Sequence, residues 1–236
     1  MMSNKYLFHL NTYNDVDHAT PVIYKFLSKG DTVDVVFLSD FDYENDYRIN
    51  FLAQYERFSA TRASQLDHFR NKIFFNRLTR KMQNNPVFGN VMKIALNMLW
   101  PNKYHSRTVA SIYEYGGPGR LNFYEAKMRN IPTICLPHGF NIFLNYDINE
   151  HVKEIKQKTG RWPDFSSRNM FEVYVLPTKR QRQWSIDWGQ DSISTFAWGS
   201  ARFFPDWSRI NLGLLENFES KCDGSAKLKV VMILIA

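Results

Sequence analysis

The stretch Pro132–Asn145, with the sequence PTICLPHGFNIFLN, decides how the rest of the chain is interpreted. Its residues Thr133–Leu136 predict a short buried strand, and Pro137 ends this strand because proline has no N–H to donate to a neighbour. His138 and Gly139 follow at the strand's carboxyl end. Ligands of open parallel α/β sheets bind at that edge. We therefore predict a catalytic His138, beside a glycine that lets a ligand approach the backbone.

Strands alternate with helices along most of the chain, which predicts a doubly wound, mostly parallel, Rossmann-like α/β sheet. A strand at Lys5–Leu10, a helix at Val16–Ser28 and a strand at Thr32–Leu38 form a first β-α-β unit. The loop after the first strand lacks the GxGxxG pattern of dinucleotide sites, and no cofactor is expected. Ile49–Trp100 is expected to be mostly helical. The other expected strands are Thr108–Tyr113, Thr133–Leu136, Glu172–Leu176 and Ser194–Trp198. We expect a sheet of about seven strands in all.

The composition indicates a globular chain with an anionic partner. Its 236 residues are 44% hydrophobic and 16% aromatic, enough for a substantial core. The 30 Lys and Arg residues against 23 Asp and Glu give a formal charge of +7, which suits a nucleotide, a phosphorylated lipid, a membrane surface or a nucleic acid. Cys135 and Cys222 lack ligand spacing, so neither a metal site nor a disulfide scaffold is expected.

No stretch has the length of a signal-peptide core or of a membrane span, and we expect a cytoplasmic protein. The basic and aromatic segment Ile49–Trp100 leaves two interpretations open. Its helices can be crossover helices with a basic outer side, or they can form an amphipathic surface that docks on anionic lipid at the inner face of the cell membrane. Nucleic acid is not expected, because no recognition motif accompanies the charge.

Two carboxylates are further catalytic candidates at the same edge of the predicted sheet. Asp15 follows the first strand together with Asp17 and His18, and it is either a base or acceptor orienter or only the N-cap of the next helix. Glu114 follows the strand at Thr108–Tyr113, and its alternative is an ordinary solvated carboxylate.

Several small and polar residues are substrate-binding candidates. Gly116 and Gly117 lie in a tight turn whose free N–H groups can hold an anion or a sugar hydroxyl, or which is purely structural. Asn141 lies in the loop after His138. Ser200 and Arg202, after the last expected strand, are the remaining candidates. Arg202 can pair with a phosphate through its planar guanidinium, or can hydrogen-bond only to nearby carbonyl groups. The aromatic residues near it are expected to pack between the last helices and the sheet: Trp184, Trp188, Trp198, Phe203, Phe204 and Trp207.

The end of the chain predicts a domain boundary. Residues 1–210 would form the Rossmann-like domain and residues 211–226 a linker. Residues 227–236, KLKVVMILIA, read as one buried strand. Because an isolated strand this apolar would be an aggregation-prone edge, we expect it to begin a second domain that is truncated in this chain.

The order of these features resembles the N-terminal half of GT-B-type glycosyltransferases and their relatives in bacterial surface-polysaccharide synthesis. These are the capsule and teichoic-acid transferases, which include CDP-glycerol glycerophosphotransferases, and the UDP-N-acetylglucosamine 2-epimerase group. The matching features are the strand with His138-Gly139, the segment Tyr174–Thr178 with Gln183-Trp184 in its helix, and Gly199–Arg202 before a linker.

The resemblance implies a transferase that moves a sugar or sugar phosphate from a nucleotide-activated sugar or glycerol donor to a glycan or lipid-linked acceptor. In such proteins the first domain faces the acceptor, so this chain would be an incomplete enzyme. His138 would act as a general base on the acceptor hydroxyl or donate to the donor phosphate, and Gly199, Ser200 and Arg202 would lie at the interdomain hinge. The alternatives are a UDP-sugar 2-epimerase and a non-catalytic, membrane-associated glycan-assembly module.

Overall fold

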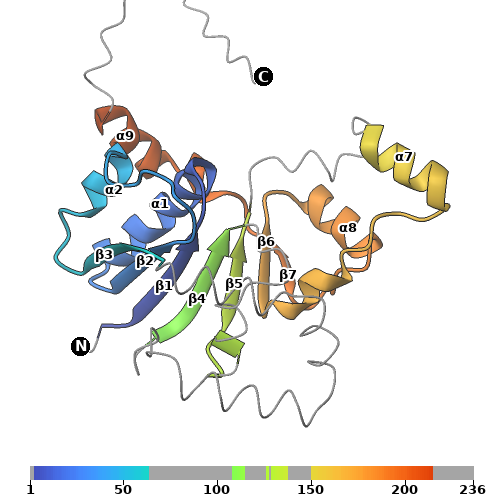
Figure 1. Cartoon of the computed structure of the whole chain (residues 1–236), viewed down its shortest axis with the longest axis horizontal. Helices are drawn as coiled ribbons and strands as arrows, with labels where there is room; N and C mark the ends of the chain where they lie inside the picture. Colours follow the sequence, from blue (N-terminus) through green and yellow to red (C-terminus); the bar gives the residue numbers. More distant parts are fainter. Residues whose placement is uncertain (1–2, 64–107, 115–125, 128, 138–149, 215–236) are drawn as a thin grey trace, which may run out of the picture.

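A seven-stranded, all-parallel sheet forms the centre of the molecule in a computed structural model, which describes residues 3–63, 108–114, 126–127, 129–137 and 150–214 (Figure 1). The strands are β1 (Lys5–Leu10), β2 (Thr32–Phe37), β3 (Phe58–Arg62), β4 (Thr108–Glu114), β5 (Thr133–Leu136), β6 (Val173–Leu176) and β7 (Thr195–Ala197). The helices are α1 (Tyr13–Ser28), α2 (Tyr47–Leu52), α7 (Glu150–Thr159), α8 (Lys179–Asp187) and α9 (Pro205–Leu214), with short 3-10 helices η2 (Ser166–Met170) and η3 (Ala201–Phe203). The predicted doubly wound α/β class is confirmed.

One strand was missed by the sequence prediction. The helical interpretation of Ile49–Trp100 is wrong at Phe58–Arg62, where β3 pairs in parallel with β2. This strand is short and lies at the end of the sheet, and its serine, threonine and arginine are exposed, so it lacks the apolar run that marks the central strands. Residues 64–107 lie outside the described residues, so the lipid-docking interpretation stays a prediction.

The strand order is β3-β2-β1-β4-β5-β6-β7. The chain therefore builds the sheet outward from β1 in one direction and then outward from β4 in the other. The loops that leave the carboxyl ends of β1 and β4 diverge at this point. In open α/β sheets the crevice at such a reversal is where ligands bind.

Both faces of the central strands are buried. On one face, Phe8 of β1 and Ile112 of β4 pack with Val16 and Ile23 of α1. On the other face, Cys135 of β5 packs with Tyr174, Phe171 and Trp188, which confirms that this cysteine is buried. Burial on both faces explains why β1, β2, β4 and β5 are so apolar in sequence.

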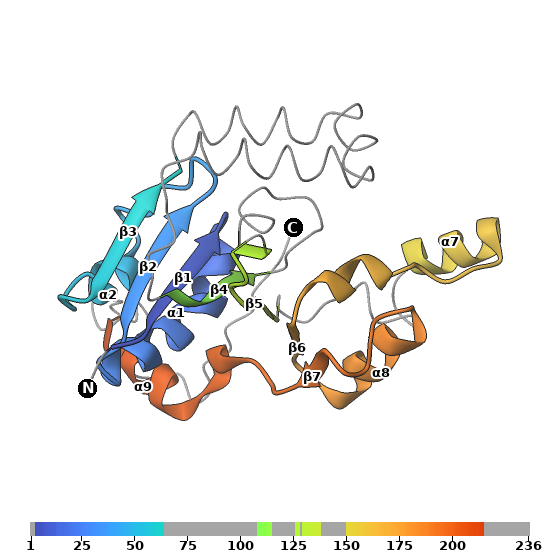
Figure 2. The same ribbon diagram turned by 90° about the horizontal axis from the view of Figure 1, so that it is seen from below.

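The segment after β7 returns to the other end of the sheet (Figure 2). There η3 and α9 contact α1 and α2, and the buried ring of Trp207 lies 6.2 Å from that of Tyr24 and 6.3 Å from that of Phe51. Helix α9 spans residues 205–214 and so continues past the predicted boundary at residue 210. Residues 215–236 lie outside the described residues, and the division into a domain, a linker and a second-domain strand stays a prediction.

Candidate functional site

The loop between β1 and α1 is held rigidly at the point where the sheet reverses. Asp15 Oδ2 accepts hydrogen bonds from the backbone N–H of Asn11 at 2.6 Å and from its side-chain amide at 3.1 Å, and Asp15 Oδ1 accepts from the Thr12 hydroxyl at 2.8 Å. The Ser39 hydroxyl, which follows β2, donates to the Asn11 carbonyl oxygen. The loop is therefore fixed from both its own helix and the neighbouring strand.

The predicted N-cap role of Asp15 is wrong, because α1 begins at Tyr13 with Thr12 as its N-cap. Asp15 instead occupies the third helical position, from which its buried carboxylate reaches back to the residues before the helix, much as the acidic residue of a capping box does. These hydrogen bonds give Asp15 a structural role in the loop. Its catalytic role stays a prediction.

Glu114 lies at the same edge as this loop. It is the last residue of β4 and pairs in register with Leu136, the last residue of β5. The other predicted residues of this region lie outside the described residues: His138, Gly139, Asn141, Gly116 and Gly117.

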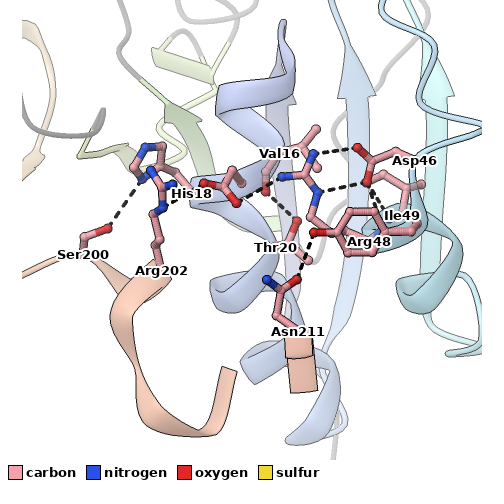
Figure 3. A network of polar contacts seen from close by, with 11 residues as sticks. Val16, His18, Thr20, Asp46, Arg48, Ile49, Ser200, Arg202 and Asn211 are labelled. Atoms are coloured by element: carbon pink, nitrogen blue, oxygen red, sulfur yellow. Dashed lines mark hydrogen bonds and ion pairs between the residues drawn. The ribbon is translucent and has the colours of Figure 1, made fainter. Parts of the chain in front are cut away.

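Ser200 and Arg202 are brought to α1 by the returning segment after β7 (Figure 3). Ser200 Oγ lies 3.5 Å from His18 Nδ1, and both side chains are buried. Arg202 Nε donates to Asp17 Oδ2 at 2.9 Å, with the arginine side chain 43% exposed. The structure thus gathers Ser200 and Arg202 one turn along the helix from Asp15.

A buried arginine that the sequence interpretation missed lies next to these contacts. Arg48 is completely buried and donates from Nε and Nη2 to the two oxygens of Asp46, at 3.0 and 2.6 Å, while its Nη1 donates to Asp17 Oδ1 at 3.1 Å. The Tyr13 ring centroid lies 4.1 Å from its guanidinium carbon. Burial alone would lower the pKa of Arg48, but the hydrogen bonds and charge of Asp46 outweigh it and raise the pKa, so the guanidinium stays charged.

These contacts form one network, the Arg48 network, which we define as Asp17, Asp46, Arg48 and Arg202. Two carboxylates face two guanidinium groups, so the charges balance. A further hydrogen bond, from Tyr47 Oη to Asn211 Oδ1 at 3.1 Å, joins α2 to α9 nearby (Figure 3). The Arg48 network therefore connects α1, α2 and η3 and is best explained as a structural element.

A second missed cluster lies in the sheet itself, between β1 and β4. His9 Nε2 lies 3.1 Å from Ser111 Oγ, and the Ser111 hydroxyl donates to Tyr113 Oη at 2.9 Å. The rings of His9 and Tyr113 stack with centroids 4.8 Å apart, and all three side chains are buried. Since the Ser111 proton is directed to Tyr113, His9 donates from Nε2 to Ser111. The cluster places polar groups directly under the reversal point of the sheet.

A sequence signal for this cluster exists. His9 and Ser111 interrupt otherwise apolar strands, KYLFHL and TVASIY, in which both faces are expected to be buried. A polar side chain at such a position requires a hydrogen-bond partner, and strands that neighbour each other across the reversal can supply it. Arg48 and Asp46 had no comparable signal, because they follow the polar stretch Ser39–Asn45 at the start of α2, where charged side chains are expected to be solvated.

The aromatic residues near the end of the described chain divide into two groups. Trp188 and Trp207 are buried, as expected. The packing prediction is wrong for three others: Trp198, Phe203 and Phe204 are 63%, 74% and 51% exposed. These rings flank Ser200 and Arg202 in sequence.

No protein-family model and no curated protein matches the sequence. Among solved structures, it is similar to UDP-GlcNAc 2-epimerase from Neisseria meningitidis bound to UDP-GlcNAc, at 12% identity over 90% of this chain and 50% of that one, with a TM-score of 0.48. It is also similar to UDP-N-acetylglucosamine 2-epimerase from Rickettsia bellii (16% identity, 92% and 48% covered, TM-score 0.42) and to a putative one from Listeria monocytogenes (11%, 84% and 45%, 0.43). The chain spans about half the length of these proteins, and the similarities assign no residue role.

Within the described ranges, no helix is long and apolar enough to cross a membrane. The same part of the chain contains no group of three or more His, Cys, Asp or Glu residues that could hold a metal ion. The predictions of a cytoplasmic location and of a membrane-surface contact are not tested by these observations.

Proposed function

We propose that this chain forms the first half of an enzyme that acts on a nucleotide-activated sugar or glycerol. The observation that carries the proposal is the reversal of the sheet between β1 and β4, with a pre-organised polar loop at its carboxyl edge. The resemblance of the His138-Gly139, Tyr174–Thr178 and Gly199–Arg202 segments to GT-B-type enzymes supports the choice of substrate class.

Two reactions fit this substrate class. Epimerisation at C2 of a UDP-sugar needs no second substrate, and the resemblance includes the UDP-N-acetylglucosamine 2-epimerase group. Transfer to a glycan or lipid-linked acceptor needs a surface for that acceptor. The exposed rings of Trp198, Phe203 and Phe204 favour this second candidate, because flat aromatic faces can pack on the apolar faces of sugar rings.

The residues at the carboxyl edge of the sheet would have different roles in both reactions. Asp15 holds the loop at the reversal point in place, which fixes the position of a bound substrate without loop ordering at the moment of binding. His138 would exchange the proton, either with an acceptor hydroxyl or at the sugar ring. Glu114, at the end of β4, is the second candidate for proton exchange.

The test is to incubate the chain with UDP-GlcNAc and to follow the sugar by proton NMR. Conversion to the C2 epimer without an acceptor would establish the 2-epimerase form, and conversion only with an added glycan or lipid-linked acceptor would establish the transferase form. Binding without turnover would support an incomplete enzyme. Absence of binding to both UDP-GlcNAc and CDP-glycerol would contradict the proposal.

The variant His138→Ala tests the catalytic assignment in whichever form is active. We expect turnover to be lost while UDP-GlcNAc still binds, because the ring is assigned to proton exchange and not to the bulk of the affinity. Lys29→Gln serves as the control, since it removes an exposed side chain at the opposite edge of the sheet. Full activity of His138→Ala would remove this histidine from the mechanism.

A further inference from the structure

The Arg48 network has a buried side and an exposed side. The side chains of Arg48 and Asp46 are buried, whereas those of Asp17 and Arg202 are 20% and 43% exposed. Arg202 reaches the first turns of α1 from η3 (Figure 3). The buried side accounts for the structural role of the network, and the exposed side is the part that a ligand can contact.

This exposed side places hydrogen-bond donors beside acceptors. Arg202 Nε lies 2.9 Å from Asp17 Oδ2, and Asp17 Oδ1 accepts from Arg48 Nη1 at 3.1 Å. Within the described ranges, the terminal nitrogens Nη1 and Nη2 of Arg202 form no hydrogen bond or ion pair, and the guanidinium carbon lies 5.6 Å from the centroid of the Phe203 ring. A guanidinium group carries five donors, and each carboxylate oxygen has two lone pairs. Both groups therefore have hydrogen bonds left to give to a ligand.

The balance of charge favours a neutral ligand over an anion. Asp17 and Asp46 offset the charges of Arg48 and Arg202, so an anion placed on Arg202 would also approach the Asp17 carboxylate. A hydroxyl group, in contrast, both donates and accepts. Two adjacent hydroxyl groups of a sugar ring can accept from Arg202 and donate to Asp17 at the same time.

Each of the two elements also contributes an exposed aromatic ring. Tyr13 lies four residues before Asp17 and so on the same face of α1, with 56% of its surface exposed. The Arg48 guanidinium carbon lies 4.1 Å from its ring centroid, which fixes the ring from one side. Phe203, next to Arg202 in η3, is 74% exposed. Flat rings of this kind can pack on the C–H faces of sugars.

We propose that Tyr13, Asp17, Arg202 and Phe203 form a binding site for a neutral sugar ring with two adjacent hydroxyl groups. Arg202 and Asp17 would hydrogen-bond to the hydroxyl groups, and the aromatic rings would pack on the C–H faces. Arg48 would position the site from the buried side, because it contacts both Tyr13 and Asp17. The site extends the proposed function, on which its place in a reaction rests: the sugar would belong to the acceptor or to the activated donor.

The first experiment measures binding of methyl glycosides to the full chain by saturation-transfer difference NMR. The probes are the methyl glycosides of glucose, galactose, mannose and N-acetylglucosamine, with glucuronic acid as the charged counterpart. We expect at least one neutral glycoside to bind, with an affinity that added salt changes little, because no net charge is paired.

The variant Arg202→Lys tests the paired donors. Lysine keeps the positive charge beside Asp17 but replaces the planar fork by a single ammonium group. We expect the Kd of the bound glycoside to rise by about tenfold, since hydrogen bonds from a charged donor are lost. Arg209→Lys is the matched control, because Arg209 is an exposed arginine of α9 that pairs with Asp206 outside the site.

The variant Phe203→Ala tests the aromatic contact. We expect it to raise the Kd by about fivefold. Ile193→Ala is its control, because Ile193 is another highly exposed apolar side chain, located before β7. Both side chains are exposed, so both variants should fold and keep the melting temperature of the unchanged chain.

The outcomes distinguish the source of the sugar and the fate of each proposal. Displacement of the glycoside by UDP-GlcNAc would indicate the sugar of the donor, and simultaneous binding would indicate an acceptor. Absence of binding by every neutral glycoside, binding of glucuronic acid alone, or unchanged affinity in Arg202→Lys or Phe203→Ala would overturn the site. Glycoside binding without any binding of UDP-GlcNAc or CDP-glycerol would keep the site and reject the nucleotide-sugar proposal. Turnover of a nucleotide sugar without glycoside binding would do the reverse.

Discussion

Two regions on the same edge of the sheet contain several basic side chains, and the partners of these side chains differ. In the Arg48 network, each guanidinium faces a carboxylate of the protein itself. At the start of α8, Lys179 and Arg180 meet the positive end of a helix whose first turn has no acidic residue. The partners differ in kind: they are carboxylates in the Arg48 network, whereas Arg180 lies on the aromatic ring of Trp184. We therefore expect the Arg48 network to contribute far more to stability than the basic residues at the start of α8.

The largest expected effect comes from Arg48→Met. The substitution keeps the volume but leaves the buried Asp46 without its bidentate partner, and breaking a buried ion pair from one side typically costs about 3–5 kcal/mol. Unfolding in urea measures the loss. Arg209→Gln is the matched control, because it removes an arginine from the exposed pair with Asp206 and should change stability by less than about 0.5 kcal/mol. A loss below about 1 kcal/mol for Arg48→Met would mean that the network does not support the fold.

The contrast between these regions also explains what the sequence could predict. The fold was predictable because apolar runs in strands such as Lys5–Leu10 and a helical stripe in α1 are local features. The strand β3 was not predictable, since this edge strand has little apolar periodicity. The N-cap assignment of Asp15 failed because the helix begins at Tyr13, with Thr12 in the cap position, and the Thr12 hydroxyl donates to Asp15 instead of accepting from the first turn.

The candidate site was less predictable than the fold. His138 could be placed at a strand end, and Ser200 and Arg202 could be named as polar residues after the last strand. The contacts of Ser200 with His18 and of Arg202 with Asp17 could not be predicted. These contacts depend on the path of the chain from β7 back to α1. The pairing of the guanidinium and carboxylate groups in the Arg48 network likewise depends on the assembled structure, because no local sequence pattern indicates which arginine will pair with a carboxylate.

Glu172→Gln tests an intermediate case, a half-exposed carboxylate with partners. Its Oε2 accepts from the Thr133 backbone N–H at 2.8 Å and from the Thr133 hydroxyl, and its Oε1 pairs with Lys127. Burial raises the pKa of Glu172, but the hydrogen bonds from Lys127 and Thr133 outweigh it and lower the pKa below the ordinary value of 4.5. The carboxylate therefore contributes stability above pH 4.5 that is lost as the pH falls through its lowered folded value.

We expect Glu172→Gln to cost about 1 kcal/mol or less at pH 7, since solvent screens a side chain that is 42% exposed. The stability of the variant should fall less steeply than that of the unchanged chain below pH 4.5. Urea unfolding at several pH values measures both effects. Glu154→Gln, in an exposed pair with Lys158, is the control. Parallel pH profiles would show that the hydrogen bonds of Glu172 do not favour its charged form.

Arg202→Gln probes the exposed end of the Arg48 network. Its ion pair with Asp17 is 2.9 Å long but 43% exposed on the arginine side, so we expect a loss of about 0.5 kcal/mol that shrinks with added salt. Hydrogen exchange of residues 200–214 should rise, because the ion pair helps hold η3 on α1. Unchanged exchange would mean that Trp207 packing alone docks this segment.

The smallest effect, and one of opposite sign to those above, is expected from Lys179→Gln/Arg180→Gln. Neutralising two cations at the positive end of α8 removes an unfavourable interaction, so the melting temperature should rise by about 1–2 °C at low salt. The gain should vanish at high salt, because exposed charges are screened there. A fall in melting temperature, like that of Arg202→Gln, would mean that the contact of Arg180 with the Trp184 ring outweighs the unfavourable interaction with the helix end. The basic residues at the start of α8 would then stabilise the fold as those of the Arg48 network do, and the expected contrast between the two regions would be lost.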